Sequence, residues 1–150
     1  DPQSEVNLLN EAGITTVFNS YGSGLRLWGN RSAAWPTVTH MRNFENVRRT
    51  GDVINESIRY FSQQYIDMPL NQALIDSLVE SVNGYGRKLI GDGALIGFKA
   101  WYDPARNEAT ELAAGHLLIS YKYTPPPPLE RLTYETEITS EYLVTLKGSK

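Results

Sequence analysis

Two stretches in the middle of the chain carry apolar side chains on one face at the spacing of an α-helix. The positions that share these faces are Ile54, Ile58, Phe61 and Tyr65 in the first stretch and Leu74, Leu78, Val82, Tyr85 and Leu89 in the second. Thr50 precedes the first stripe, and its side chain can accept a hydrogen bond from the first turn of a helix. The second helix is predicted to start at Asn71. The pattern predicts two main amphipathic helices, separated at Met68-Pro69. Gly84 and Gly86 lie inside the second stripe and weaken the helix prediction there. Glycines at such positions are typical of a helix that another backbone approaches closely.

Short β-branched or alternating runs on either side of these helices predict strands. The runs are residues 14–18, 25–28, 95–102 and 116–123. The turn Tyr21-Gly22-Ser23-Gly24 predicts that the first two runs form a hairpin. A short helix over residues 4–12 precedes the hairpin, and a loop over residues 33–43 follows it. The sequence therefore predicts an α+β domain, in which a small mixed β-sheet packs with the two main helices.

The end of the chain has a different pattern. Pro125 to Pro128 are consecutive prolines, which predict a stiff polyproline II spacer of roughly 12 Å. Apolar side chains then alternate again, at Leu132, Tyr134 and Ile138 and in a second stretch at Tyr142, Val144 and Leu146. We expect a domain over residues 1–124 and a strand arm over residues 125–150. The strand can pair with the sheet edge of another subunit or fold back into its own sheet, and the pattern leaves both open.

Composition narrows the classes of protein. The 150 residues are 41% hydrophobic and 21% charged, with a net charge of -3 and no cysteine. One globular domain with neither disulfides nor thiolate metal sites fits these values, and the charge predicts neither a nucleic-acid nor a membrane partner. No apolar run reaches transmembrane length. The start Asp1-Pro2-Gln3-Ser4 is not that of a signal peptide, and we interpret the chain as a piece of a longer polypeptide.

Residue patterns for catalysis, cofactors and metals are weak. His40 and His116 do not belong to a metal-spaced cluster, and no nucleophile has an evident base partner. Gly22-Ser23-Gly24 lacks the third glycine of a dinucleotide-binding fingerprint. The pair Asp52 and Glu56, one helical turn apart, is typical of a solvated helix face. We therefore expect no catalytic residue, no cofactor and no metal.

A basic group consists of Arg42, Arg48 and Arg49, which cluster before the predicted start of the first main helix. These side chains can bind an acidic partner surface or an acidic arm such as Glu135 and Glu137. Ordinary surface charge explains them equally well. Nearby, Arg31 can stack on the ring of Trp28, which would be a structural role.

Six short segments occur along the chain in an order that is typical of one family. They are Trp28-Gly29-Asn30-Arg31-Ser32, Val47-Arg48-Arg49-Thr50, Gly93-Ala94-Leu95-Ile96-Gly97, Trp101-Tyr102-Asp103-Pro104, Leu129-Glu130-Arg131-Leu132 after the prolines, and Ile138-Thr139-Ser140-Glu141-Tyr142-Leu143. Over nearly the whole chain this set resembles the C-terminal domain of contractile tail sheath proteins, as in myovirus tails, R-type pyocins and similar injection machines. Each segment alone is a weak signal, whereas the ordered set is fairly specific.

The resemblance implies a structural subunit of the virion, assembled in the cytoplasm of the bacterial host. Its domain would form the inner layer around a tail tube, and contraction would drive the tube through a bacterial envelope. The implied partners are other copies in a helical lattice and the tail tube protein, without nucleic acid or membrane insertion. In this interpretation Leu132, Tyr134, Ile138, Tyr142 and Val144 belong to the inter-subunit arm. The basic group of Arg42, Arg48 and Arg49 would contact the tube or a neighbour.

Two other classes of protein remain open at this point. A small-ligand or carbohydrate-binding module of a phage-like particle could use Tyr21, Trp28, Trp35 and Trp101, although these aromatic residues belong to different predicted elements. A hydrolase would need a catalytic site, and the sequence does not assemble one.

Overall fold

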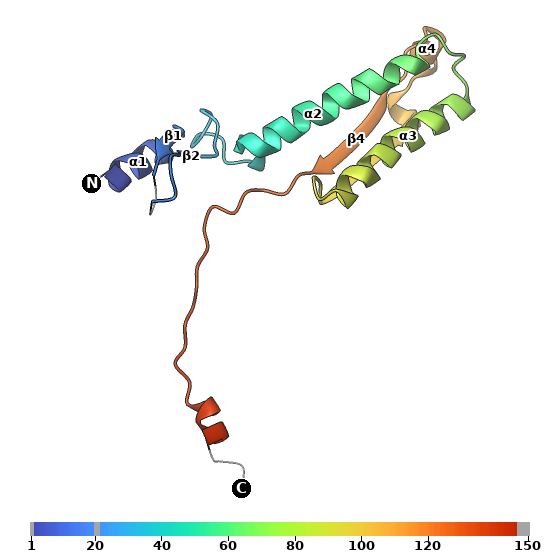
Figure 1. The fold of residues 1–150 in the computed structure, drawn as a ribbon. Helices are drawn as coiled ribbons and strands as arrows, with labels where there is room; N and C mark the ends of the chain where they lie inside the picture. Colours follow the sequence, from blue (N-terminus) through green and yellow to red (C-terminus); the bar gives the residue numbers. More distant parts are fainter. Residues whose placement is uncertain (1, 20–21, 147–150) are drawn as a thin grey trace.

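The computed structural model describes residues 2–19 and 22–146 (Figure 1). Its main elements are α1 (Pro2–Glu11), β1 (Thr16–Phe18), β2 (Arg26–Trp28), α2 (Glu45–Ser62), α3 (Gln72–Gly91), β3 (Gly97–Tyr102), α4 (Ala109–Ala113) and β4 (Ile119–Thr124). Short 3-10 helices lie at η1 (Met41–Asn43), η2 (Gln63–Tyr65), η3 (Pro104–Arg106) and η4 (Glu141–Leu146). The predicted α+β class is confirmed.

The body of the protein, which we define as residues 45–124, packs α2 and α3 on one face of a two-stranded sheet. β3 and β4 pair antiparallel from Gly97 opposite Thr124 to Tyr102 opposite Ile119. Phe98 points toward α3 at Gly86, and Tyr123, its register partner, points toward α2 at Gly51. Because paired residues of a ladder share a face, both helices cover the same side of the sheet.

The core of the body lies between these helices and the sheet. Its buried apolar side chains are Val47, Ile54, Ile75, Val82, Leu95 and Ala100. The side chain of Asn83 in α3 also accepts from the backbone N–H of Ala100 at 2.8 Å and donates to its carbonyl at 3.0 Å. Pairing both backbone groups in this way joins α3 to the edge of β3 that does not pair with β4, and satisfies polar groups that burial would otherwise leave unpaired.

The N-terminal elements form a separate unit beside the start of α2 (Figure 1). β1 and β2 pair antiparallel, with Thr16 opposite Trp28, and the rings of Phe18 and Trp28 meet edge to face at 5.8 Å. The predicted hairpin is therefore present, although Tyr21 in its turn lies outside the described residues. The expected single mixed sheet is replaced, in the described part of the chain, by two separate antiparallel sheets of two strands each.

Helix α2 begins earlier than the sequence indicated. Its N-cap is Phe44, without a side-chain cap, and the predicted cap Thr50 lies inside the helix. The reason is that Gly51 and Val47 are buried one and two turns, respectively, ahead of Ile54, the first residue of the visible stripe, which lengthens the buried face of the helix. The predicted start of the second helix is confirmed, and Oδ1 of its N-cap Asn71 accepts from the N–H of Leu74 at 2.9 Å.

After β4 the chain passes the start of α2 and then leaves the body as an extended segment (Figure 1). We call residues 131–146 the arm. Within the described residues the segment Leu132 to Ile138 forms no ladder, so it does not fold back into its own sheet. The second alternating stretch is not extended, because residues 141–146 form the 3-10 helix η4. Local hydrogen bonds from Leu143 N–H to the carbonyl of Ser140 and from the Thr145 hydroxyl to the carbonyl of Tyr142 hold this turn.

Candidate assembly interface

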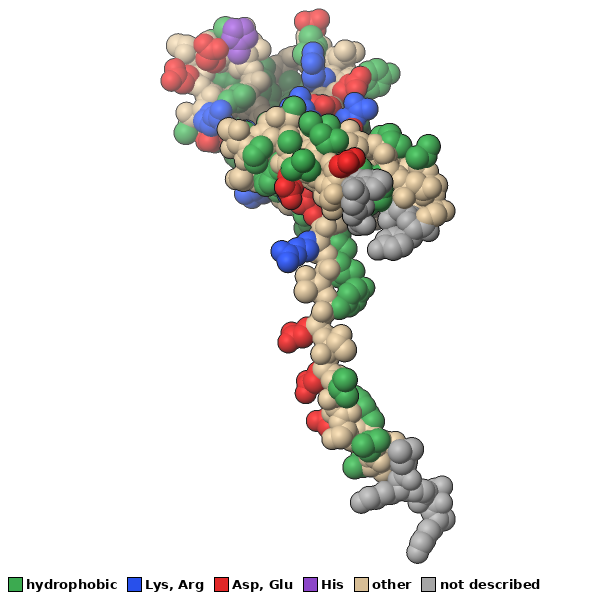
Figure 2. All heavy atoms as spheres, turned by 90° about the vertical axis from the view of Figure 1, so that its left-hand side faces the viewer, with side chains coloured by type: hydrophobic (Ala, Val, Ile, Leu, Met, Phe, Trp, Pro, Cys, Tyr) green, Lys and Arg blue, Asp and Glu red, His purple; other side chains and the backbone are tan. Residues whose placement is uncertain are grey.

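The arm exposes the apolar side chains that the sequence singled out. Every side chain from Arg131 to Thr145 is exposed, and Ile138 is 98% exposed. The other predicted arm residues are Leu132, Tyr134, Tyr142 and Val144, all of which are exposed. Figure 2 shows apolar side chains gathered along one side of the arm and acidic ones along the other. Burying one large apolar side chain contributes about 1.5–3 kcal/mol, so this face is a strong candidate for contact with a partner.

The base of the arm is docked against its own chain. The ring of Pro125 is buried, and the carbonyl of Pro126 accepts a hydrogen bond from the Asn46 side chain at 3.1 Å. Four residues later, Nε of Arg31 donates to Oε1 of Glu130 at 2.9 Å, and Nη2 of Arg31 donates to Oε2. These contacts cover residues 125–130, so the prolines follow the surface of the body and do not form a free spacer.

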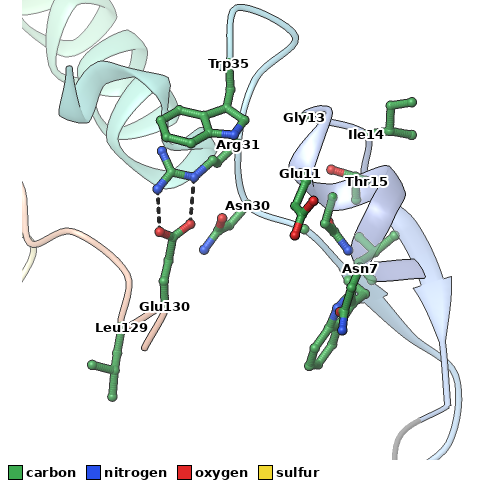
Figure 3. A pocket seen from close by; sticks show the side chains of 14 residues that line it. Asn7, Glu11, Gly13, Ile14, Thr15, Asn30, Arg31, Trp35, Leu129 and Glu130 are labelled. Atoms are coloured by element: carbon green, nitrogen blue, oxygen red, sulfur yellow. Dashed lines mark hydrogen bonds and ion pairs between the residues drawn. The ribbon is translucent and has the colours of Figure 1, made fainter. Parts of the chain in front are cut away.

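Arg31 is held between aromatic rings at this junction. Its guanidinium lies 3.6 Å from the centroid of the Trp35 ring and 4.7 Å from that of Phe44. Figure 3 shows the guanidinium under the Trp35 indole with the Glu130 carboxylate facing it. The predicted stacking of Arg31 on Trp28 is wrong, because Trp28 packs on Phe18 across the hairpin and Arg31 stacks on Trp35 instead. Periodicity could not identify this pair, because Arg31 and Glu130 are 99 residues apart. The only signal was that both lie within segments of the family resemblance.

The three arginines of the basic group lie on the exposed surface around the start of α2. Arg42 is in η1, and Arg48 and Arg49 are inside α2, whereas the sequence placed them before the helix. Arg48 pairs with Asp52 at 3.1 Å, one turn further along. Among the described residues no ion pair joins this group to the arm carboxylates. Their contact with a tube or neighbour stays a prediction.

The hairpin offers a second exposed apolar surface. Val17, Leu25 and Leu27 are exposed, and as a two-stranded sheet the hairpin has an unpaired backbone edge on each side within the described chain. Beside it lies an open cavity of about 650 Å³ between α1, the hairpin, the segment after it and the arm base. Figure 3 shows Asn7, Glu11 and Asn30 around this space. Exposed apolar strands next to an open cavity are typical of a surface that receives another chain.

The aromatic residues of the ligand-binding alternative do not converge. Trp28 and Trp35 border the cavity, whereas Trp101 lies on β3, with the Lys122 ammonium 5.9 Å from its ring centroid. Tyr21 lies outside the described residues. The alternative therefore has no common aromatic site in the part of the chain that the structure describes.

Two side chains that could take part in acid–base chemistry, His116 and Tyr121, contact neighbouring side chains at hydrogen-bond distance. Among residues 2–19 and 22–146 no group of His, Asp and Glu side chains is arranged to hold a metal. His116 lies 2.8 Å from Glu111. Burial, with a smaller effect of Tyr123, raises the pKa of Tyr121, which stays protonated and donates to Oδ1 of Asn55.

None of the described helices combines the length and apolar character that would cross a membrane.

A protein-family model described as the phage tail sheath C-terminal domain matches residues 37–139. The chain belongs to this family. The tail sheath protein of Burkholderia phage BcepMu is 86% identical over 148 residues, which cover 99% of the chain and 31% of that protein. The tail sheath protein of Escherichia phage P2 is 36% identical over 146 residues, covering 97% of the chain and 36% of that protein. The chain thus spans about a third of the length of these tail sheath relatives.

Solved structures share the fold of this sheath domain. A contracted PVC sheath complex of an extracellular contractile injection system matches with a TM-score of 0.80 at 16% identity, over 94% of the chain and 41% of that chain. The six-fold symmetrised baseplate of the anti-feeding prophage matches with a TM-score of 0.79 at 19% identity, over 91% and 39%. At these identities the similarity establishes the α+β architecture, including most of the chain outside residues 37–139.

Proposed function

We propose that the protein is a structural subunit of a contractile tail sheath, in which copies polymerise in a helical lattice around a tail tube. Contraction of this lattice would drive the tube through a bacterial envelope. The observation that carries the proposal is the exposed apolar face of an extended arm, on a domain that belongs to the tail sheath family. We place the subunit in the virion tail, assembled in the host cytoplasm and acting without a cofactor.

In this proposal residues 132–138 of one copy add a strand to the hairpin of another. The ten residues 131–140 can span roughly 33 Å when extended, which is enough to reach beyond the surface of their own body. The exposed Leu25 and Leu27 beside an unpaired edge supply both apolar cover and backbone hydrogen bonds. Because arm and hairpin are different surfaces, each copy binds a neighbour head to tail, and such contacts propagate into a helical polymer.

The basic group is proposed as a second contact, to an acidic surface of the tube or of a neighbouring copy. Arg42 and Arg49 are exposed near the start of α2, and their charge would favour encounter and register more than affinity. Arg48 contributes less to such a contact, because Asp52 already partly neutralises it.

Removal of the arm tests the proposal. In the complete protein, deletion of residues 131–150 should leave the body folded, since the body core and the docked segment 125–130 both precede the deletion. We expect electron microscopy to show sheath polymers for the intact protein and none for the deletion. Circular dichroism serves as the control for folding. Normal sheaths from a folded deletion variant would overturn the proposed role of the arm.

A further inference from the structure

The segment that joins the body to the arm, residues 125–130, makes several contacts with the rest of the chain. Three contacts in succession hold residues 125–130: the buried ring of Pro125, the bond from Asn46 to Pro126, and the paired bonds between Arg31 and Glu130. Beyond Glu130 every side chain up to Thr145 is exposed. The last fixed point of the chain before the arm is therefore the carboxylate of Glu130.

We propose that Arg31 and Glu130 form a clamp that sets where the arm begins and the direction in which it leaves the body. Both are positioning residues for arm exchange, so this inference rests on the proposed function of the arm. Residues 125–130 would then belong to the domain, and the arm would start at Arg131.

The geometry of the clamp is suited to fixing a direction. Two parallel N–H bonds to one carboxylate define a plane as well as a distance, which a single lysine ammonium does not. The flat faces of Trp35 and Phe44 restrict the guanidinium, so Arg31 loses little further freedom when Glu130 binds. The result is a carboxylate held at one place and in one orientation.

Burial separates this pair from an ordinary surface ion pair. The side chains of Arg31 and Glu130 are 19% and 34% exposed, whereas those of Arg48 and Asp52 are 74% and 49% exposed. Screening by solvent weakens the second pair much more than the first. Arg48 and Asp52 therefore provide a matched control within the same protein.

The clamp also connects the arm to the body through short contacts. Phe44, which lies against the Arg31 guanidinium, is the N-cap residue of α2, and its backbone pairs with that of Arg31 in an isolated bridge. A pull on the arm by a neighbour would reach α2 through Glu130, Arg31 and Phe44. Without the clamp the same pull would act on the single bond from Asn46 to Pro126 and on the buried Pro125, directly after the end of β4.

Holding the base before a partner arrives also favours assembly. Ordering six residues in advance removes their conformational entropy from the free energy lost on binding. It also shortens the tether and concentrates the arm around one direction, which raises its effective concentration at a correctly placed neighbour.

A distance measurement on the chain in solution tests the direction of the arm directly. The 150 residues contain no cysteine, so Ser77→Cys on α3 and Thr133→Cys on the arm, both exposed, can carry a pair of spin labels. We expect a narrow distance distribution in the parent and a broad one after Arg31→Met, which keeps apolar contact with the rings but cannot bind Glu130. Arg31→Lys should also broaden it, because one ammonium cannot make the paired bonds.

Two further variants complete the comparison. Glu130→Ala removes the clamp from the arm side and leaves the aromatic packing of Arg31 intact, so it decides the result if Arg31→Met fails to fold. Arg48→Met, which breaks only the exposed pair with Asp52, should leave the distribution as narrow as in the parent. Equal widths for Glu130→Ala and the parent would overturn the clamp.

Assembly of the complete protein separates failure of the clamp from failure of the arm. We expect Glu130→Ala to raise the concentration at which sheath polymers appear by about tenfold or more, as for the loss of a charge-assisted bond pair. Glu80→Ala, which breaks an exposed ion pair with Arg87 on α3 outside the arm, is the matched control and should change it little. If Glu130→Ala assembles normally while deletion of residues 131–150 does not, the clamp is wrong and the arm stands. If the deletion variant assembles normally, the arm is not needed for assembly, and the proposed function is wrong whatever the result for Glu130→Ala.

Discussion

Apolar side chains are buried in the body and exposed in the arm. In the body, Ile54 is 1% exposed and Val82 is 2% exposed, because α2 and α3 lie on the same face of the β3–β4 sheet. In the arm, Ile138 is 98% exposed, although it is as apolar as Ile54. The difference teaches that a stripe of apolar residues is buried by its own chain only where a second element can reach it. The arm leaves the body at Glu130, and within the described residues no second element covers it.

We expect the largest effect from a variant whose arm cannot form a strand. Tyr134→Pro removes a backbone donor and an exposed aromatic side chain together, and we expect it to abolish sheath assembly while leaving the stability of the body unchanged. Tyr134→Phe keeps both the donor and the ring and should assemble. Electron microscopy and thermal unfolding of the two variants check this. Assembly of the proline variant would show that residues 132–138 bind in another conformation.

A matched pair of isoleucines sharpens the contrast between burial and exposure. We expect Ile54→Ala to lower the free energy of unfolding by about 2–5 kcal/mol, because it opens a cavity in a closed core. Ile138→Ala should change it by less than about 0.5 kcal/mol in the isolated subunit. Urea denaturation of both variants measures the difference. A large loss of stability in Ile138→Ala would mean that the arm packs on its own body in solution.

Two glycines of α3 test how closely this helix packs on β3. A Cβ added at Gly86 would lie 2.1 Å from Cδ1 of Phe98, so Gly86→Ala should destabilise the protein by about 1–3 kcal/mol. At Gly84 the nearest atom is a flexible Arg87 nitrogen at 3.6 Å, and Gly84→Ala should be neutral or stabilising by up to about 1 kcal/mol. Thermal unfolding can compare them. Equal effects would contradict the close packing of α3 on β3.

The smallest expected effect concerns the basic group. Replacing Arg48 and Arg49 together with Glu should weaken co-sedimentation with tail tubes and lower sheath yield. Stability should fall by less than about 1 kcal/mol, since only the exposed pair with Asp52 is lost. Arg59→Glu, near the other end of α2, is the control and should leave co-sedimentation unchanged. If all variants behave alike, the group is ordinary surface charge.

Local periodicity predicted the two main helices of the body, but it misplaced the start of α2. The stripes containing Ile54 and Val82 and the start of the second helix near Asn71 can be found without a structure, because helix geometry brings residues close in sequence onto one face. The start of α2 was missed, because Gly51 has no apolar side chain to extend the stripe, although it is buried and faces the hydroxyl of Tyr123. Gly86 was noticed as a close approach, but the approaching group is a ring and not a backbone.

The arm illustrates a second limit of prediction. Alternation at Leu132, Tyr134 and Ile138 indicated a strand but not its partner, because any sheet edge can supply the same backbone bonds. The turn η4 was predicted as extended, since an alternating pattern as short as three apolar residues also fits a tight helical turn.

By itself the sequence determined the α+β class, the two amphipathic helices and the hairpin, because each depends on residues close together in the chain. Only the tertiary structure decided that the strands form two sheets, that Trp35 stacks on Arg31, and that Glu130 closes on the same guanidinium. These contacts join residues up to 99 positions apart. Their formation depends on how the body folds as a whole, which no local pattern encodes.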